Sequence, residues 1–556
     1  MYKHSLIVNV QEAMKNNWDL PSVSDYKSTP VYYSEVAKQI AKLHILYQEC
    51  GIKKGDKIAL CGRNSSTWAI SFFSIISYGA VAVPLLHEFK PDSVHHLVNH
   101  SEAKMLFVGD VVWEALDANQ MPDLHAIIIM QDFSLASCKD KHYKKAHENL
   151  ENSFLKKYPN GFTKDDVKYQ EDKPGDLALI NYTSGTTSLS KGVMLSYKAV
   201  NSNYIFAREN MTSLKQGMNM ISMLPMAHMY GLQFEIIFPF MVGVHIHFLT
   251  RVPSPKIIAE AFSSVKPDLI IAVPLIIEKI YRAKLKPILD KTLMKILLKT
   301  PIIDTLIQNK ILNELNEAFG GRFNSVIIGG ASLNQEVEAF FKKIGFRYTI
   351  GYGMTECAPL VGYEDWSKFE MYSCGKVVSG MELKIKSNDP YNEVGEILVR
   401  GDNVMMGYYK NPEATMQVIK EGWLHTGDLG LIDREGNIFI KGRTKNLILG
   451  ASGQNIYPEE IEDRLNSTEY IIESIVMQQD GKLVALVYLD QDKLDNEKID
   501  LAHSKHKMLE IREAINKDLP AYSQISYIYI QEEEFEKTPK RSIKRYLYTS
   551  INPIKK

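Results

Sequence analysis

A cluster of hydroxylated residues follows the apolar run Leu177–Ile180, which predicts the end of a buried strand. The cluster consists of Thr183, Ser184, Gly185, Thr186 and Thr187. Short hydroxyls and free backbone N–H groups on a glycine loop suit a polyanion, and Lys191 adds a positive charge. The spacing is not that of a Walker loop, and a polar surface loop is the plain alternative for this cluster taken alone.

Further segments with residues capable of chemistry follow downstream. They are Leu224–His228, Gly351–Glu356, Gly422–Asp428, Lys441–Lys445 and Gly453–Glu462. In addition, a predicted strand over Ser325–Ile328 leads into three small residues, Gly329, Gly330 and Ala331, which would let a flat ring approach the backbone. Each segment is a weak signal by itself, whereas the whole set in this order is specific.

This set of motifs resembles the acyl-adenylate-forming superfamily, which includes acyl-CoA synthetases, peptide-synthetase adenylation domains and beetle luciferases. The resemblance runs from about residue 30 to the C-terminus. It implies a reaction in which a carboxylate attacks the α-phosphorus of ATP, giving acyl-AMP and pyrophosphate, and a thiol then displaces AMP. Two anions meet in the first step, so the site must screen negative charge. The carboxylate is already ionised, so positioning and electrostatics matter more than a general base.

The resemblance assigns the first motifs to the nucleotide. The hydroxyl-rich loop and Lys191 would hold the β- and γ-phosphates, while Thr186 and Glu356 would bind Mg²⁺, a hard cation that takes oxygen ligands. The adenine would lie against small or flat residues, among which the Tyr352 ring is suited to stacking. These residues are Gly329, Gly330, Ala331 and Tyr352, and the neighbouring Gly351, Gly353 and Thr355 are further cofactor-binding candidates.

The resemblance assigns the later motifs to the ribose, the acid and the thiol. Asp428 could accept from both ribose hydroxyls, because one carboxylate has two oxygens, and Arg443 would be a second ribose or phosphate contact. His228 would lie near the acyl carboxylate, although a histidine on an apolar loop is usually structural. Lys445 would be the hinge about which the C-terminal domain rotates, and Gly453 would open the loop that then faces the thiol.

The chain departs from the family pattern at three serines. Ser188 and Ser190 stand where the family has Gly and Pro, which changes the stiffness of the phosphate loop. Ser542 stands where a lysine would contact the reacting carboxylate and α-phosphate, and a serine cannot supply that charge. We expect a flanking cation to replace it. The candidates are Lys540 and Lys544, with Arg541 as a third.

The bulk composition is that of an ordinary globular protein. The chain has 556 residues, of which 45% are hydrophobic and 24% charged, and its net charge of -1 gives no reason to expect nucleic acid binding. Five cysteines without metal-ligand spacing fit a reducing compartment, and the N-terminus lacks a signal-peptide pattern. We therefore expect a cytoplasmic protein, with peripheral contact at the inner face of the membrane as an open alternative.

The elements that must position these residues alternate between helix and strand. A helix over 31–50, a strand at Ile58–Leu60 and a strand at Lys104–Val108 predict an α/β layer architecture. The uncharged window Thr67–Leu86 is long enough for a membrane span, but it contains Gly79 and Pro84. We interpret it as a buried helix, Trp68–Tyr78, followed by a core strand, Ala80–Val83, and expect no transmembrane span.

The expected fold class is α/β, with a large N-terminal domain of α/β layers plus a β-rich part and a small, mobile α+β C-terminal domain. The N-terminal AMP-binding domain would cover residues 1–440 and the C-terminal domain residues 441–556. Strands are expected at Met220–Leu224 and Leu269–Val273, and in the β-rich part at Glu396–Arg400 and Asn437–Ile440. The lysine-studded tract 279–319 is interpreted as an amphipathic surface subdomain.

The function that these motifs favour is ATP-dependent ligation of a fatty acid, in first place a long-chain one, to CoA. Leu224–Gly231, Glu278–Tyr281 and the helical tract ending at Phe319 resemble long-chain acyl-CoA synthetases. The expected small molecules are thus the fatty acid, ATP, Mg²⁺ and CoA. Two alternatives stay open for an enzyme: an acyl carrier protein as acceptor, or another hydrophobic carboxylate as substrate. Ser542 also invites a nucleotide- or acyl-binding protein with weakened adenylation.

Overall fold

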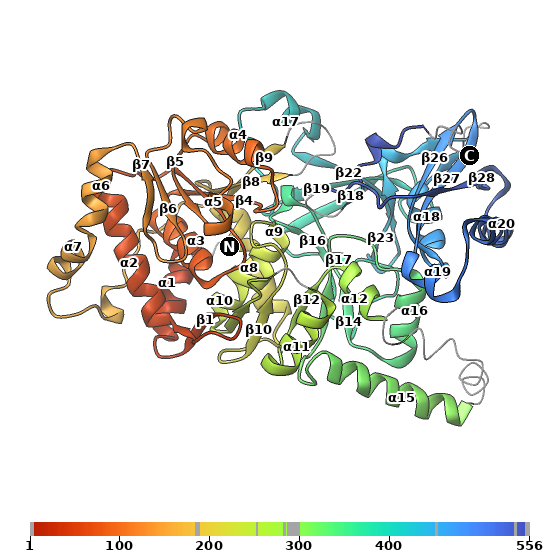
Figure 1. The fold of residues 1–556 in the computed structure, drawn as a ribbon, viewed down its shortest axis with the longest axis horizontal. Helices are drawn as coiled ribbons and strands as arrows, with labels where there is room; N and C mark the ends of the chain where they lie inside the picture. Colours follow the sequence, from red (N-terminus) through yellow and green to blue (C-terminus); the bar gives the residue numbers. More distant parts are fainter. Residues whose placement is uncertain are drawn as a thin grey trace.

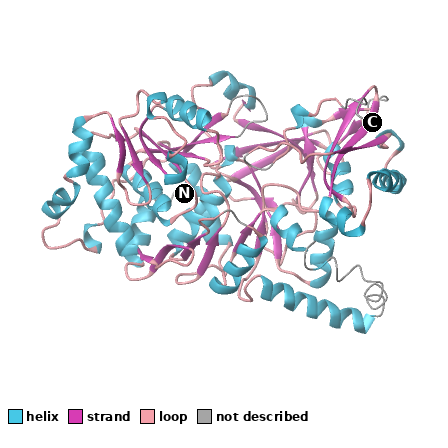
Figure 2. Ribbon diagram, viewed as in Figure 1, coloured by secondary structure: helices cyan, strands magenta, loops and turns pink. Residues whose placement is uncertain are grey.

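The computed structural model describes residues 5–183, 190–251, 254–281, 285, 301–450, 454–538 and 542–550. Helices and strands alternate through the N-terminal half, a strand-rich part follows, and the C-terminal residues form a smaller body at the other end of the molecule (Figure 1). Figure 2 shows the helices packed around the sheets of the larger part. The predicted α/β fold class, with a β-rich part and a small α+β C-terminal domain, is confirmed.

An eight-stranded sheet in the order β20-β9-β8-β4-β3-β5-β6-β7 is the largest layer. Its centre is parallel, since β3 pairs in parallel with both β4 and β5. Parallel strands need crossover connections, and helices provide them here. The strands are β3 (Lys57–Cys61), β4 (Val81–Leu85), β5 (Ala103–Val108), β6 (Ala126–Ile129), β7 (Leu135–Cys138), β8 (Leu177–Thr183), β9 (Lys191–Ser196) and β20 (Gly407–Tyr408). The helices are α2 (Tyr33–Glu49), α3 (Ser66–Tyr78), α4 (Pro91–Ser101), α5 (Asp110–Trp113), α6 (Lys141–Glu148) and α7 (Leu150–Lys157).

The uncharged window after residue 66 folds as predicted into a buried helix and a core strand. Helix α3 ends at Tyr78, and Gly79 caps it with φ 87°, a left-handed conformation that glycine adopts without strain. Strand β4 continues through Pro84, which pairs with Leu60, so it is longer than expected. No helix in the described ranges combines the length and the apolar character that crossing a bilayer requires.

A second sheet, β10-β11-β1-β2, packs with α2 and with α10 (Phe238–Val242), and α10 in turn packs with the N-terminal helix α1 (Leu6–Asn16). Strand β10 ends at Ser222, two residues before the predicted end at Leu224. The reason is that the N–H groups of Met223 and Leu224 donate to a buried carboxyl, Glu235, instead of a neighbouring strand. The other elements are β1 (Pro21–Asp25), β2 (Val31–Tyr32), β10 (Asn219–Ser222), β11 (His245–Phe248), α8 (Tyr197–Asn210), α9 (Met229–Gly231) and η3 (Leu232–Ile237).

A third, parallel sheet has the order β12-β13-β14. Its strands are β12 (Ile270–Ala272), β13 (Val326–Ile328) and β14 (Tyr348–Ile350), with the helices α11 (Pro255–Val265), α12 (Pro274–Ile280), α15 (Pro301–Ala318) and α16 (Gln335–Ile344) around it. Helices α12 and α15 account for the two ends of the predicted tract 279–319. Residues 282–284 and 286–300 of that tract lie outside the described residues.

The β-rich part contains two small sheets. One has the order β15-β16-β17, and the other has the order β18-β19-β22-β21 with β23 paired to β22. The elements are β15 (Tyr352–Gly353), η5 (Thr355–Cys357), β16 (Leu360–Tyr363), β17 (Lys376–Val377), β18 (Met381–Lys386), β19 (Gly395–Gly401), α17 (Pro412–Val418), β21 (Ile419–Lys420), β22 (Trp423–Ile432) and β23 (Ile438–Arg443). Because β23 continues through Ile440 to Arg443, the domain boundary at residue 440 stays a prediction.

The C-terminal part has a core of its own around the sheet β26-β27-β28. It touches the larger part where Asn334 Nδ2 donates to Ser467 Oγ at 2.7 Å. Its elements are η6 (Thr444–Asn446), β24 (Ile448–Leu449), β25 (Asn455–Ile456), α18 (Pro458–Asn466), β26 (Ile471–Gln479), β27 (Lys482–Leu489), α19 (Gln491–Glu497), α20 (Leu501–Asp518), β28 (Tyr527–Gln531) and η8 (Arg545–Leu547).

Candidate active site

The predicted phosphate loop connects the two strands of the β8–β9 hairpin. Thr183 ends β8 and pairs with Lys191, which begins β9, so these two residues lie opposite each other. Gly192 lets the hairpin pack, because a Cβ there would lie 2.9 Å from the Ile180 side chain and 3.0 Å from the Tyr182 ring. The loop itself is outside the described residues, namely Ser184, Gly185, Thr186, Thr187 and Ser188.

Glu356 lies next to this hairpin and is held by a tyrosine that sequence reasoning missed. The Tyr408 hydroxyl donates to Glu356 Oε1 at 3.0 Å, and the Lys191 ammonium lies 4.8 Å from the centre of the Tyr408 ring. Strand β20 brings Tyr408 there by pairing with β9. Burial and the Glu356 carboxylate both raise the pKa of Tyr408, so its phenol stays protonated and can donate.

The surroundings of Glu356 suit a magnesium ion that is bound together with phosphate oxygens. One carboxylate oxygen accepts from Tyr408, and no donor among the described residues bonds the other. A single carboxylate completed by substrate phosphates and water is a usual protein share of a Mg²⁺ site. Across the described ranges, no group of three or more His, Cys, Asp or Glu side chains could hold a metal by itself. Thr186, the other predicted ligand, is outside these ranges.

The predicted adenine residues lie at the carboxyl ends of two parallel strands. Gly329, Gly330 and Ala331 follow β13, while Gly351 follows β14 and donates from its N–H to Ile328 O at 2.8 Å. A Cβ on Gly329 would lie 3.0 Å from the Tyr230 ring, and Gly330 has φ +91°. Both positions therefore need glycine for local reasons, and this edge of an α/β sheet is where such folds bind ligands. The contact with adenine stays a prediction.

Asp428, a predicted nucleotide ligand, is buried, with 4% of its surface exposed. Tyr352 Oη donates to Asp428 Oδ2 at 2.7 Å, and Arg443 Nε lies 2.9 Å from Oδ1. Pairing of β22 with β23 sets Asp428 opposite Arg443. Each oxygen keeps a further lone pair for a ribose hydroxyl. Sequence reasoning assigned Tyr352 a ring contact and missed its hydroxyl, which needs a partner 76 residues away.

Tyr352 and Glu356 are joined by a short segment with a tight turn. Gly353 approaches Pro359 so closely that a Cβ there would lie 2.3 Å from the Pro359 carbonyl oxygen. Thr355, a further predicted binding residue, begins the turn η5 and is buried. The turn therefore fixes the position of Glu356 relative to Tyr352, the residue that contacts Asp428.

Lys445, the predicted hinge, lies in a group of positive charges beside Asp428. Burial, Arg443 and Arg545 lower the pKa of Lys445, while Asp428 and Glu459 act in the opposite direction. Arg545 forms an ion pair with the buried Glu462 of α18. Arg545 lies three residues after Ser542, and it was not among the cations proposed to replace the missing lysine. The predicted thiol-loop residue Gly453 is outside the described residues.

Two backbone contacts join the described residues on either side of positions 539–541. Thr538 N donates to Ser542 O at 2.8 Å, and a bridge pairs Lys537 with Ile543. Lys544, one predicted substitute, forms an exposed ion pair with Glu536 at 3.1 Å. The other two candidates, Lys540 and Arg541, lie outside the described residues. The catalytic roles of Lys540 and Lys544 stay predictions.

His228 caps the short helix α9 that follows the loop from Leu224. Its Nδ1 accepts from Tyr230 N at 3.2 Å, so the imidazole ring is held against the first turn of α9. Tyr230 Oη in turn donates to Ile327 O at 3.1 Å, in the strand before Gly329. The histidine loop and the predicted adenine residues are therefore linked through one side chain.

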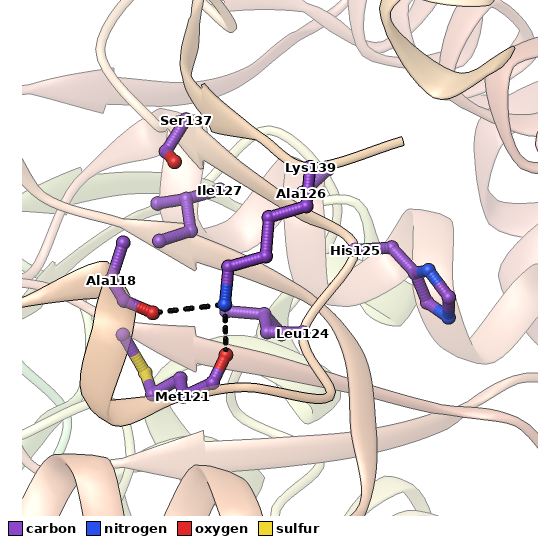
Figure 3. Close-up of a pocket in the computed structure, with 8 residues that line it drawn as sticks. All are labelled: Ala118, Met121, Leu124, His125, Ala126, Ile127, Ser137 and Lys139. Carbon is purple, nitrogen blue, oxygen red and sulfur yellow. Dashed lines mark hydrogen bonds between the residues drawn. The ribbon is translucent and has the colours of Figure 1, made fainter. Parts of the chain in front are cut away.

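A separate hollow lies at the opposite edge of the large sheet, where residues 118–125 face β6 and β7, and the Lys139 side chain lines it (Figure 3). The Lys139 ammonium donates to Met121 O at 2.8 Å and to Ala118 O at 3.1 Å. An ammonium that satisfies backbone carbonyls in this way is structural. This hollow therefore takes no part in the candidate site.

Comparisons with known proteins show the family of the chain. The family described as "AMP-binding enzyme" matches residues 10–409, and that described as "AMP-binding enzyme C-terminal domain" matches residues 445–550. A long-chain-fatty-acid–CoA ligase of Escherichia coli O6:H1 is 28% identical over 485 residues, covering 83% of this chain and 80% of its own. The chain therefore belongs to the AMP-binding enzyme family, the adenylate-forming superfamily that its motifs resemble.

Two solved structures share the fold over nearly their whole length. The anthranilate CoA ligase AuaEII, in complex with anthranoyl-AMP, aligns with TM-score 0.80 at 18% identity and covers 98% of this chain and 96% of its own. ATP-bound MatB from Rhodopseudomonas palustris aligns with TM-score 0.76 at 20% identity, over 97% of this chain and 98% of its own. Both the α/β part and the small C-terminal part are thus those of this family.

Proposed function

We propose that this chain activates a fatty acid, in first place a long-chain one, as an acyl-adenylate and transfers the acyl group to CoA, releasing AMP and pyrophosphate. The observation that carries the proposal is that the short segment from Tyr352 to Glu356 makes a contact with a candidate ligand-binding residue at each of its ends. At one end Tyr352 holds Asp428 next to Arg443, and at the other Glu356 bonds to Tyr408 beside Lys191. The name of the Escherichia coli relative supports a long-chain fatty acid as the substrate.

The adenylation step would depend on charge screening. Lys191 and the loop before it would bind the β- and γ-phosphates, and Asp428 would hold the ribose. Glu356 would hold Mg²⁺, which supplies Lewis-acid screening of the phosphate charge when bound. The fatty acid carboxylate would approach from the His228 side, forming the bond to the α-phosphorus while the bond to the leaving pyrophosphate breaks. The positive charges that oppose repulsion of the two anions are Lys191 and Arg443.

The thioester step would use the same site after the C-terminal part turns about Lys445. The CoA sulfur would form the bond to the acyl carbon, and AMP would leave with the electron pair of the broken bond. The thiol proton would pass to solvent or to AMP. A thiol has a pKa near 8.5, so a fraction is thiolate at neutral pH.

One observation favours a second candidate function, that of a nucleotide- or acyl-binding protein with weakened adenylation. Ser542 occupies the lysine position, and Lys544 is engaged by Glu536. If no other cation reaches the α-phosphate, the chain would bind nucleotide and acid but form acyl-AMP slowly.

Pyrophosphate release with palmitate, ATP and Mg²⁺ tests the proposal. Activity with palmitate that depends on chain length across an acid panel supports a fatty acid ligase. A flat response across all lengths contradicts it, and tight AMP binding without turnover supports the second candidate. Supplying CoA or a holo acyl carrier protein as acceptor then separates the two possible thiols.

A further inference from the structure

A buried carboxyl group lies directly behind the loop that carries His228. Glu235 belongs to η3, a π-helical turn, and its side chain is fully buried. One of its oxygens, Oε2, accepts three hydrogen bonds: from Ser222 Oγ at 3.1 Å, from Met223 N at 3.0 Å and from Leu224 N at 2.9 Å. No motif of the sequence pointed to this residue.

These three donors lie where strand β10 ends and the histidine loop, residues 223–228, begins. Ser222 is the last residue of β10, so the next two N–H groups have left the sheet while still buried. A buried N–H group needs an acceptor, and Glu235 supplies one oxygen to both. The carboxyl therefore determines where the strand stops and in which direction the loop leaves it.

The rest of the loop is held by two buried amides. Asn64 donates to Leu224 O at 2.7 Å and accepts from Met226 N at 3.2 Å. Asn181, on β8, donates to Ala227 O at 2.8 Å. With Glu235 at its start, the loop is bonded along its backbone up to the residue before His228. The loop is therefore rigid, which a positioned ligand-binding side chain requires.

Burial favours the uncharged form of Glu235. Burial raises its pKa to about 8, and the three hydrogen bonds to Oε2 only partly oppose this. The titratable side chain that faces it is Tyr230, whose pKa is itself raised by burial, and no ion pair reaches Glu235 from the described residues. Its second oxygen, Oε1, has no hydrogen-bond partner among those residues and can carry the proton.

We propose that Glu235 is a positioning residue for the adenylation step: through its hydrogen bonds to Ser222, Met223 and Leu224, it fixes the turn that presents His228 to the incoming fatty acid carboxylate. The inference rests on the proposed function and adds a residue to it. An uncharged group is required because a carboxylate behind the loop would repel the anionic substrate. The three donors need an acceptor oxygen, and a neutral carboxyl provides it without that charge.

Two substitutions test separately the acceptor oxygen of Glu235 and the ability of its side chain to ionise. Glu235→Gln keeps an acceptor oxygen and cannot ionise, so at pH 7 its kcat and KM for palmitate should stay within about 3-fold of wild type. Glu235→Ala removes the acceptor, so it should raise the KM for palmitate or lower kcat by about 10-fold or more, with the KM for ATP nearly unchanged. Wild-type kinetics in folded Glu235→Ala would contradict the proposal.

The pH profile provides a readout that a merely structural role would not change. Wild type should lose palmitate-dependent pyrophosphate release as the pH rises through about 8, when Glu235 ionises, and Glu235→Gln should not show this loss. Identical profiles for the two proteins would overturn the proposed role of the uncharged acid, even if Glu235→Ala failed to fold.

Glu338 offers a matched control. It is 2% exposed, burial raises its pKa to about 7, and it accepts from Tyr372 N at 2.8 Å, away from the histidine loop. Glu338→Gln and Glu338→Ala should change the melting temperature without changing the KM for palmitate or the alkaline side of the profile. An equal kinetic effect at Glu338 would mean that buried carboxyls act through stability alone.

Hydrogen exchange tests the positioning without relying on catalysis. Amides of residues 219–231 should exchange faster in Glu235→Ala than in wild type and remain protected in Glu235→Gln. If wild type releases no pyrophosphate with any acid, the proposed function fails, while this comparison still decides whether Glu235 holds the loop. Unchanged exchange in Glu235→Ala would overturn the inference.

Discussion

Tyr352 contributes a ring and a hydroxyl to the nucleotide site, and the two features can be separated. The motif around it suggested a ring that stacks on adenine. The structure adds a hydroxyl that donates to the buried Asp428 at 2.7 Å. A sequence motif identifies neighbours along the chain, whereas this partner is reached only by folding the β22–β23 hairpin against the segment that follows β14. For that reason the ring could be predicted and the hydrogen bond could not.

Tyr352→Phe should weaken AMP binding by about 3- to 10-fold. The substitution keeps the ring but removes the donor to Asp428 Oδ2, while Arg443 still pairs with Oδ1. A buried acceptor that loses its donor costs roughly 1–3 kcal/mol, part of which is lost as affinity. Isothermal titration with AMP measures the effect. Tyr197→Phe removes a comparable buried hydroxyl, one that donates to Ile76 O at 2.8 Å, and should leave AMP affinity unchanged. Equal affinity for Tyr352→Phe and wild type would show that Asp428 does not need this donor.

Tyr408→Phe should raise the magnesium concentration needed for half-maximal pyrophosphate release by about 3-fold or more. Without the phenol, Glu356 loses its orienting hydrogen bond, and ligands that are poorly oriented bind metal less well. Tyr409→Phe is the control, since that hydroxyl bonds to Glu102 at an exposed position. A magnesium titration in which both variants match wild type speaks against Glu356 as a ligand.

At the scale of elements, periodicity and breakers predicted what packs locally. Helix α3, the cap at Gly79 and strand β4 were predicted because an apolar run is interrupted by residues with known backbone preferences. The short strand β20 was not predicted. Its two residues carry no periodicity, and they form a strand only because β9 offers an open edge. The π-helical turn η3 was likewise missed, because nothing in its sequence distinguishes a π-helical turn from an ordinary α-helix.

Helix α18 carries a titratable group that couples the C-terminal part to pH. Burial and neighbouring carboxylates, among them Glu278 of α12, raise the pKa of Asp463 to about 7. The folded protein therefore holds this proton more tightly than the unfolded chain. Protonated Asp463 therefore stabilises the folded protein at low pH, and this stabilisation is lost as the pH rises toward about 7.

Asp463→Asn should therefore gain melting temperature relative to wild type as the pH rises from about 5 to about 8, by roughly 2 °C. The amide keeps the shape of the side chain and cannot ionise. Scanning calorimetry at several pH values measures the difference between the two proteins. The exposed Asp480, replaced by Asn, should show no such trend. A difference between Asp463→Asn and wild type that is independent of pH would mean that Asp463 does not carry the proton.

At the scale of the whole molecule, two bodies meet at a small polar contact. Asn334, which caps α16, reaches Ser467 at the end of α18, and each body has its own hydrophobic core. Two cores joined by one chain segment could be predicted from sequence, because the motifs before and after residue 440 are separate. The position of one body against the other could not, since it depends on a few surface contacts.

Lys445→Pro should uncouple the two half-reactions. Proline fixes φ near -65°, so a rotation about this residue would be blocked while one arrangement of the two bodies remains allowed. We expect ATP–pyrophosphate exchange within about 3-fold of wild type and acyl-CoA formation reduced by about 10-fold or more. Lys445→Ala removes the charge and leaves the backbone free, so it shows how much of the effect is electrostatic. Parallel losses in both half-reactions would argue against a hinge at this position.

The pairing of β20 with β9 also bears on how the chain is made. Strand β9 is complete at Ser196, yet the strand that covers its edge ends at Tyr408, roughly 210 residues later. During synthesis, the edge next to the phosphate loop is therefore open for as long as those residues take to emerge. Open edges invite pairing with other chains. Newly made protein should accordingly depend on protection of this one strand, and slowing translation between the two segments should raise aggregation.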